Sequence, residues 1–139
     1  MIKRLTLLMA ILFVAAGLAA CAPAATVTVA NEQLNFVKMD LSDSYANILP
    51  SQGNKILTVK FLAQNENPDM TKISDAFFGQ TPSTISNGTA SVPCKSIAFE
   101  KNTNEIIVAL IFDVPENFKT SVSKLTLSGS DLKAIELNL

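Results

Sequence analysis

Two side chains near the C-terminal end have a spacing that occurs in acyl-transfer chemistry. Ser121 and Lys124 form a Ser-x-x-Lys pattern, which works when both side chains lie on one face of a helix. The surrounding residues, Val122 to Ser128, instead predict a β-strand, on which residues three apart point to opposite faces. The chain also has no histidine, which excludes Ser-His-Asp and Cys-His arrangements and removes the commonest zinc ligand. The sequence therefore predicts no catalytic residue, and we expect the protein not to be an enzyme.

A run of side-chain oxygens, Asn65-Glu66-Asn67-Pro68-Asp69, offers ligands of the type that calcium binds. The run lacks the ligand spacing and the central glycine of a calcium loop, and its composition is typical of a turn. Paired carboxylates of the kind that hydrolyse glycosides cannot be located by spacing alone. The sequence therefore predicts no metal site and no cofactor.

The N-terminal segment has the parts of a secretory signal peptide. Lys3 and Arg4 precede an apolar run from Leu5 to Leu18, and the small residues Ala19 and Ala20 follow. Leu18-Ala19-Ala20-Cys21 resembles the lipobox of bacterial lipoproteins. That resemblance implies that residues 1–20 are removed, that Cys21 becomes the first mature residue, and that its thiol carries the lipid anchor.

Two other interpretations of Cys21 stay open from the residues alone. Ordinary cleavage after Ala22 would remove Cys21, and cleavage further upstream would leave it free to form a disulfide with Cys94. If Cys21 is lipidated, Cys94 is the only other cysteine. A lone cysteine of this kind is either a small buried hydrophobe, which we favour, or a reactive thiol.

Charge and length restrict the classes of partner. Without Lys3 and Arg4 the eleven basic residues become nine, against twelve acidic ones, so the mature chain has a net charge of −3. This balance argues against a nucleic-acid partner, which requires clustered lysine and arginine. The apolar run is short for a retained transmembrane helix. The organisation we expect is a signal peptide at 1–20, a lipidated cysteine and short tether at 21–30, and one domain at 31–139.

The elements of that domain read as short strands separated by turns. Leu57, Val59, Phe61 and Ala63 alternate with polar residues, so Lys55 to Gln64 is a strand with one buried face. Glu105 to Val114 is apolar on both faces, which indicates a central or doubly covered strand. In Gln33 to Leu41 the apolar positions change parity at Phe36-Val37, which suggests a β-bulge. Further strands are expected at Thr26–Val29, Ile73–Phe78, Cys94–Glu100, Val122–Ser128 and Leu132–Leu139.

Two short segments have a choice of interpretation. Asn87-Gly88-Thr89 is formally a glycosylation sequon, but Asn-Gly is also the strongest hairpin signal, and we predict a type I′ turn there. Phe77-Phe78 would form an exposed binding patch if one face of its strand is open, or part of the core if both faces are covered. The long loop Ser42 to Asn54 contains the only tyrosine, Tyr45.

Seven to eight short strands with frequent turns predict an all-β sandwich or barrel. Leu57-Thr58-Val59-Lys60-Phe61, then Ala109 to Glu116, then Leu125 to Gly129, resemble the immunoglobulin-like domain of unknown function found in small bacterial lipoproteins. The likeness covers about residues 31–129. It implies an immunoglobulin-like antiparallel β-sandwich in the cell envelope and brings no catalytic residues with it.

The function we expect is that of a non-enzymatic envelope lipoprotein that binds a partner protein or another envelope component. An aspartate directly after the lipidated cysteine would resemble a signal for retention in the inner membrane. Position 22 is an alanine, so the outer membrane is the expected site if the organism has one. The domain would then face the periplasm or the exterior. The alternative is an exported protein that binds a small ligand or a metal.

Overall fold

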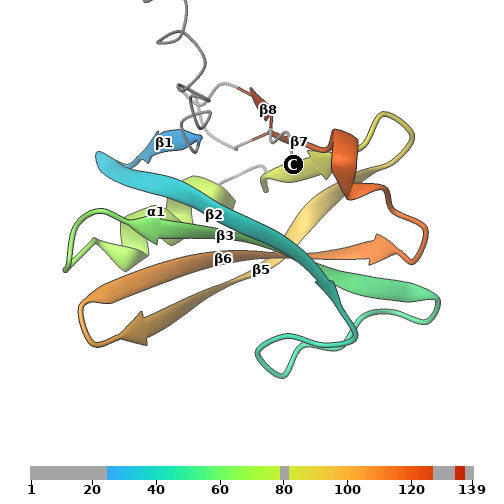
Figure 1. Cartoon of the computed structure of the whole chain (residues 1–139), viewed down its shortest axis with the longest axis horizontal. Helices are drawn as coiled ribbons and strands as arrows, with labels where there is room; N and C mark the ends of the chain where they lie inside the picture. The colour runs from blue at the N-terminus through green and yellow to red at the C-terminus, as the bar shows by residue number, and fades with distance from the viewer. Residues whose placement is uncertain (1–24, 79–81, 127–133, 137–139) are drawn as a thin grey trace, which may run out of the picture.

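The computed structural model describes residues 25–78, 82–126 and 134–136 (Figure 1). This part of the chain is mostly β, which confirms the all-β expectation in that coarse sense. It also holds one α-helix, α1 (Met70–Phe78), and one 3₁₀ helix, η1 (Thr120–Val122). The strands are β1 (Thr26–Val29), β2 (Glu32–Ser42), β3 (Asn54–Ala63), β4 (Thr84–Ser86), β5 (Ser91–Asn102), β6 (Glu105–Pro115), β7 (Lys124–Thr126) and β8 (Ala134–Glu136).

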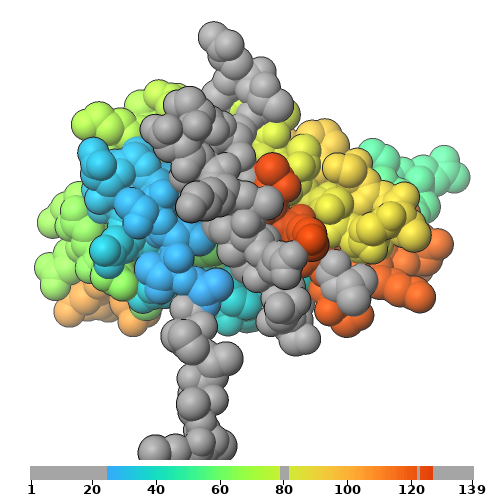
Figure 2. All heavy atoms as spheres, turned by 90° about the horizontal axis from the view of Figure 1, so that it is seen from above, coloured from blue at the N-terminus to red at the C-terminus, as the bar shows by residue number. Residues whose placement is uncertain are grey.

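The strands form one antiparallel sheet in the order β1-β2-β3-β6-β5-β4-β7-β8. The sheet has two halves, with β1, β2, β3 and β6 on one side of β5 and β4, β7 and β8 on the other. Strand β5 belongs to both halves, because Ser91–Pro93 pairs with β4 and the residues from Cys94 onward pair with β6. The pairing shifts register between Cys94 and Ser96, where the extra residue lets the strand bend. As a result the sheet curls, with β1, β7 and β8 above β2, β3, β6 and β5 (Figure 1). Figure 2 views the upper face directly, with β1 in blue and β7 in red.

The core lies inside the curl. It contains the alternate residues Leu57, Val59, Phe61 and Ala63 of β3, as the sequence predicted. Strand β6 lies between β3 and β5, and both Ile111 and Phe112 on its opposite faces are fully buried. The prediction of a central strand covered on both faces is therefore confirmed.

The predicted bulge in β2 is also confirmed. Phe36 pairs with Phe61 and Lys38 pairs with Lys60, so Val37 is an extra residue with no counterpart on β3. The bulge turns Phe36 and Met39 to the same, inner face, where both pack against the core. The change of parity in the sequence was the signal for this irregularity.

The strand expected at Ile73–Phe78 is wrong, because this segment is the end of helix α1. Asp69 caps the helix: its carboxylate accepts from the Lys72 N–H at 3.0 Å and its carbonyl from the Ile73 N–H at 3.0 Å. Ile73 and Phe77, four residues apart, are fully buried, and the Phe77 ring stacks on Phe61 with centroids 6.4 Å apart. Phe78 is 36% exposed, so only one of the two phenylalanines reaches the surface.

The hairpin at Asn87-Gly88 is present, but the predicted type I′ turn is wrong. Strand β4 ends at Ser86 and β5 begins at Ser91, so the loop has four residues. Gly88 has φ +87°, whereas Asn87 lies outside the left-handed region and its side chain accepts from the backbone N–H of Ala90 at 2.9 Å. Consecutive left-handed residues occur instead at Ala30-Asn31, between β1 and β2, and at Ala46-Asn47. Both pairs have the geometry of a two-residue type I′ turn.

The strands expected near the two ends of the chain are present, and their bounds agree with the expected ones in part. Strand β1 lies within the range 21–30 that the sequence assigned to the tether, and it pairs with β2. The strand expected at Val122–Ser128 begins only at Lys124, because Thr120–Val122 form the 3₁₀ helix. Of the strand expected at Leu132–Leu139, the structure describes only Ala134–Glu136, and these residues form β8. In the described ranges, no helix is both long and apolar enough to cross a membrane.

Candidate functional site

The loop between β2 and β3, Asp43–Gly53, is held to the sheet by several side-chain contacts and forms the candidate site. We call it the β2–β3 loop. It lies below the sheet, on the side away from β1 (Figure 1). Its polar contacts reach three strands, with Lys60 on β3, Glu100 on β5 and Asp113 on β6. The outer face of the sheet, on the side opposite the inner core, carries four buried residues that are at most 2% exposed: Ile56, Thr58, Ala109 and Ile111.

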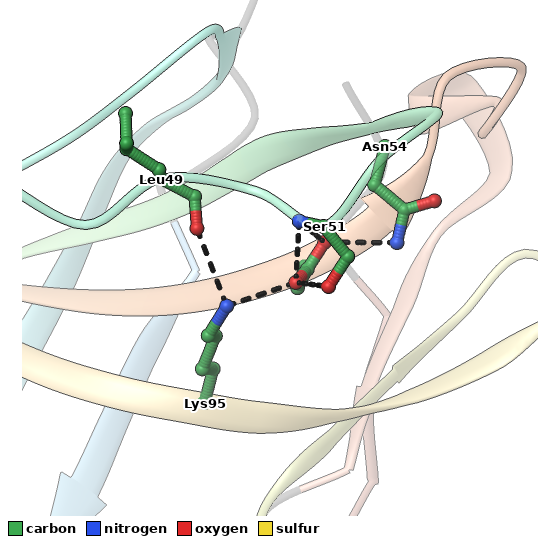
Figure 3. Close-up of polar contacts among 5 residues, drawn as sticks. Leu49, Ser51, Asn54 and Lys95 are labelled. Atoms are coloured by element: carbon green, nitrogen blue, oxygen red, sulfur yellow. Dashed lines mark hydrogen bonds and ion pairs between the residues drawn. The ribbon is translucent and has the colours of Figure 1, made fainter.

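The C-terminal part of the loop is fastened by the carboxylate of Asp113 (Figure 3). Its oxygens accept from the Ser51 N–H at 3.0 and 3.2 Å, from the Ser51 hydroxyl at 2.6 Å and from the Asn54 side chain at 2.8 Å. The Lys95 ammonium lies 2.9 Å away. Burial would raise the pKa of Asp113, but the hydrogen bonds from Ser51, Lys95 and Asn54 together outweigh it and hold the pKa far below its usual range. Asp113 is thus an ionised structural acceptor.

A second group fastens the N-terminal part of the loop. The Tyr45 hydroxyl donates to Glu100, and the Lys60 ammonium lies 3.0 Å from the same carboxylate and 4.7 Å from the centre of the Tyr45 ring. Hydrogen bonds from Tyr45 and then from Lys60 lower the pKa of Glu100. Burial, and then the bond to Glu100, raise the pKa of Tyr45. Burial would lower the pKa of Lys60, but the hydrogen bonds to Glu100 and Tyr45 outweigh it and raise the pKa, so Lys60, with 16% of its side chain exposed, stays charged.

Between the two fastened parts the loop presents an apolar side chain to solvent. The backbone of Tyr45 and Ile48 exchanges two hydrogen bonds, of 2.8 and 3.1 Å, around the Ala46-Asn47 turn. The next residue, Leu49, is 70% exposed, and its carbonyl accepts from Lys95 at 3.3 Å. A large exposed hydrophobe on a rigidly held backbone suits contact with another molecule, because little ordering is left to be done on binding.

The candidates for chemistry from the sequence fall elsewhere. Ser121 lies in η1 and Lys124 in β7, so they are not on one helical face. In the turn at 65–69, the Asn65 side chain accepts from the Asn67 N–H at 3.0 Å and Asp69 caps α1. The turn interpretation of this run is confirmed. In the described residues there is no group of three acidic, cysteine or histidine side chains arranged to hold a metal.

Cys94 is buried and free. Burial raises the pKa of its thiol to about 11, and the sulfur lies 3.2 Å from the carbonyl of Ser96. The interpretation as a small buried hydrophobe is confirmed. Cys21, the predicted lipid attachment residue, lies outside the described residues, as does the whole of the leader.

Two hollows in the described surface are partly open to solvent. The larger, of about 340 Å³, is lined mainly by turn residues, among them Asn87, Pro115 and Phe118. The smaller, of about 110 Å³, lies at the β5–β6 turn and is bordered by Glu66, Lys101 and Glu105 among others. No residue of the β2–β3 loop lines either hollow.

The sequence did not single out the residues that hold this loop. The loop was recognised from its composition, and Tyr45 was noted as the only tyrosine, but Glu100, Lys60 and Asp113 carried no local signal. Comparisons with protein-family models, with curated proteins and with solved structures found no match to this chain.

Proposed function

We propose that the protein is a lipid-anchored lipoprotein of the bacterial cell envelope that binds another envelope protein or component without catalysing a reaction. The observation that carries the proposal is Leu18-Ala19-Ala20-Cys21 after a basic and apolar leader. The diacylglycerol on Cys21 would hold the chain to the membrane, because several acyl chains together anchor firmly.

The structure adds a limit on the distance from the membrane. Strand β1 begins at Thr26, five residues after Cys21, and an extended chain of that length spans at most about 18 Å. Strand β1 lies above the sheet and the β2–β3 loop below it (Figure 1). With the lipid end uppermost, the β2–β3 loop lies on the side away from the bilayer, where a partner can reach it. An outer membrane, if the organism has one, is the proposed location, with the domain in the periplasm or outside the cell.

The proposed activity is binding because the acidic side chains with lowered pKa and the buried thiol already have structural roles. Asp113 and Glu100 are each held by neighbouring donors, and Cys94 is buried with a raised pKa. The alternative, an exported protein that binds a small ligand or a metal, has less support, since the two hollows described above are partly open to solvent and bordered by turns rather than enclosed and apolar.

We propose the immunoglobulin-like sandwich as the finer description of the fold. In its favour, the two halves that share β5 enclose a single core, with residues of β3 and β6 on one side and Ile85 of β4 and Leu125 of β7 on the other. An experimentally determined structure would test it through the packing angle between the halves.

The anchor is tested by metabolic labelling of the full chain with a tagged fatty acid in a bacterium that lipidates a control lipoprotein. The wild type and Cys94→Ala should be labelled, and Cys21→Ala should not. An unlabelled wild type beside a labelled control lipoprotein would refute the lipid anchor.

The contact surface is tested separately by cross-linking in intact envelopes. Leu49→Ser should weaken a cross-linked complex that the wild type forms, whereas Met70→Ser, at the start of α1 and 46% exposed in the wild type, should not. Equal yields for the wild type and Leu49→Ser would remove the loop from the proposal and leave the anchor standing.

A further inference from the structure

In the described part of the chain, strand β2 is unpaired on one edge along about half of its length. Strand β1 pairs only with Glu32–Asn35 of β2, and the N–H of Phe36 donates a hydrogen bond to the carbonyl of Ala25 at 2.8 Å. Beyond that point, on the side away from β3, the described chain places no strand next to Val37–Leu41. We call these five residues the free edge. An unpaired strand edge carries backbone donors and acceptors that can pair with a further strand.

The side chains of the free edge are unusual for a surface strand. Val37 is 49% exposed and Leu41 42% exposed, and both belong to the few large hydrophobic residues exposed in the described chain. Between them, Lys38 and Asp40 form an ion pair of 2.7 Å, with side chains 55% and 45% exposed. Lys38 pairs with Lys60 and Asp40 with Thr58, which puts both on the outer face of the sheet.

We propose that the free edge pairs antiparallel with the free edge of a second copy, in a register centred on Met39. In this register Lys38 faces Asp40 of the second copy, and Asp40 faces its Lys38. Val37 faces Leu41 of the second copy in the same way, and Met39 faces its own counterpart. Opposite charges and apolar pairs placed directly across two strands both stabilise the pairing.

The charges also select this register over its neighbours. A shift that centres the pair on Lys38 puts two lysines opposite each other, and one that centres it on Asp40 puts two aspartates opposite each other. A slip by one residue is excluded because it would bring outer-face residues against inner-face ones. Charged residues usually keep strand edges apart. Here a lysine and an aspartate two positions apart make the edge complementary to itself.

The symmetry of such a pair places β1 of both copies on one side of the joined sheet and both β2–β3 loops on the other. The two-fold axis of an antiparallel strand pair is perpendicular to the sheet, so both copies present the same face in the same direction. Strand β1 of each copy then lies above the joined sheet, and the two β2–β3 loops lie below it. Two lipid anchors could enter one membrane, although the pairing itself does not depend on the anchor.

Cysteine cross-linking of the full chain tests the register. Lys38→Cys and Asp40→Cys, produced together in one cell, should give a disulfide-linked dimer in whole-cell extracts under a mild oxidant, whether or not the chain is lipidated. Neither variant alone should exceed the wild-type background from Cys21 and Cys94, because neither new thiol faces itself. Lys38→Cys with Lys101→Cys, an exposed lysine at the far end of β5, is the matched control and should stay at background. A mixture that stays at background, or one variant that cross-links by itself as well as the mixture does, would overturn the proposal.

Charge exchange tests the same register without new thiols. Lys38→Glu or Asp40→Lys alone puts like charges across the edge and should lower the dimer association constant about tenfold, measured by sedimentation of the detergent-solubilised full chain. The double exchange restores opposite charges and should recover dimerisation, and Lys101→Glu should have no effect. A double variant that is folded by its urea midpoint but remains monomeric would refute the pairing.

Discussion

Replacement of Asp113 by asparagine should release the β2–β3 loop from the sheet. The carboxylate accepts hydrogen bonds from Ser51, Asn54 and Lys95, at distances between 2.6 and 3.2 Å. Asparagine has nearly the same shape, but it loses the charge and directs an NH₂ group toward donors. A hydrogen bond to a charged group contributes about 1.5–3 kcal/mol. Ser51 is exposed and the Lys95 side chain is 41% exposed, so water replaces part of that loss. We therefore expect a decrease of about 2–3 kcal/mol in unfolding free energy.

The decisive readout is the exchange of the Ser51 amide hydrogen, because Asp113 is the acceptor of that N–H. In Asp113→Asn this amide should exchange at least tenfold faster, which corresponds to about 1.4 kcal/mol, and the outer face over Ile111 should become more accessible. The control is Asp43→Asn in the same loop. Asp43 contacts Lys55 and has a side chain 87% exposed, and an exposed ion pair of this kind contributes little to stability because water screens it.

The same variant should change the response to acid. Because the folded-state pKa of Asp113 lies below its usual value, its contribution is complete above about pH 4 and is lost as the pH falls through the lower folded-state pKa. Asp113→Asn should therefore lose part of the decrease in stability below about pH 4. An unchanged Ser51 exchange rate, or an equal effect from Asp43→Asn, would refute the fastening role of Asp113.

Other predictions concern the core and the turns. Phe112→Ala should reduce the unfolding free energy by about 3–5 kcal/mol, since Phe112 is fully buried, and an unchanged urea midpoint would contradict this. Ala30→Asn should raise the melting temperature, because Ala30 has φ +51° and asparagine tolerates that conformation better; a lower one would argue against the turn. Gly88→Val should reduce stability by about 1–3 kcal/mol, as φ is +87° there, and a neutral urea titration would count against that geometry. Cys94 should resist thiol reagents at pH 7–8 until urea unfolds the chain, because burial raises its pKa to about 11; rapid labelling of the folded protein would be inconsistent with this.

Strong periodic signals made the middle of the sheet predictable. Alternation in β3, two apolar faces in β6 and the parity change at Val37 each follow from how side chains meet a core. Helix α1 was missed because it has only nine residues. Two features of the sequence indicate a helix there: Asp69 as the N-cap, and the four-residue spacing of the apolar residues Ile73 and Phe77. The sequence analysis interpreted the same apolar residues as part of a strand.

The candidate site was less predictable because its contacts join distant parts of the chain. Asp113 meets Ser51, 62 residues away, and Tyr45 meets Glu100, 55 residues away. No spacing along the sequence indicates such pairs, since they arise only when β3, β6 and β5 lie side by side. The lipobox is different, because it is read as a short linear segment and needs no fold to be recognised.

The way β5 serves both halves of the sheet has a consequence for folding. Its first residues pair with β4 and its later ones with β6, while β6 pairs with β3 across separations such as Asn54 to Pro115. Neither half can therefore be lost while the other keeps all of its pairings, so unfolding should be a single cooperative transition. Because contacts so distant along the chain close slowly, the domain should also fold on the slow side for its size, in milliseconds to seconds.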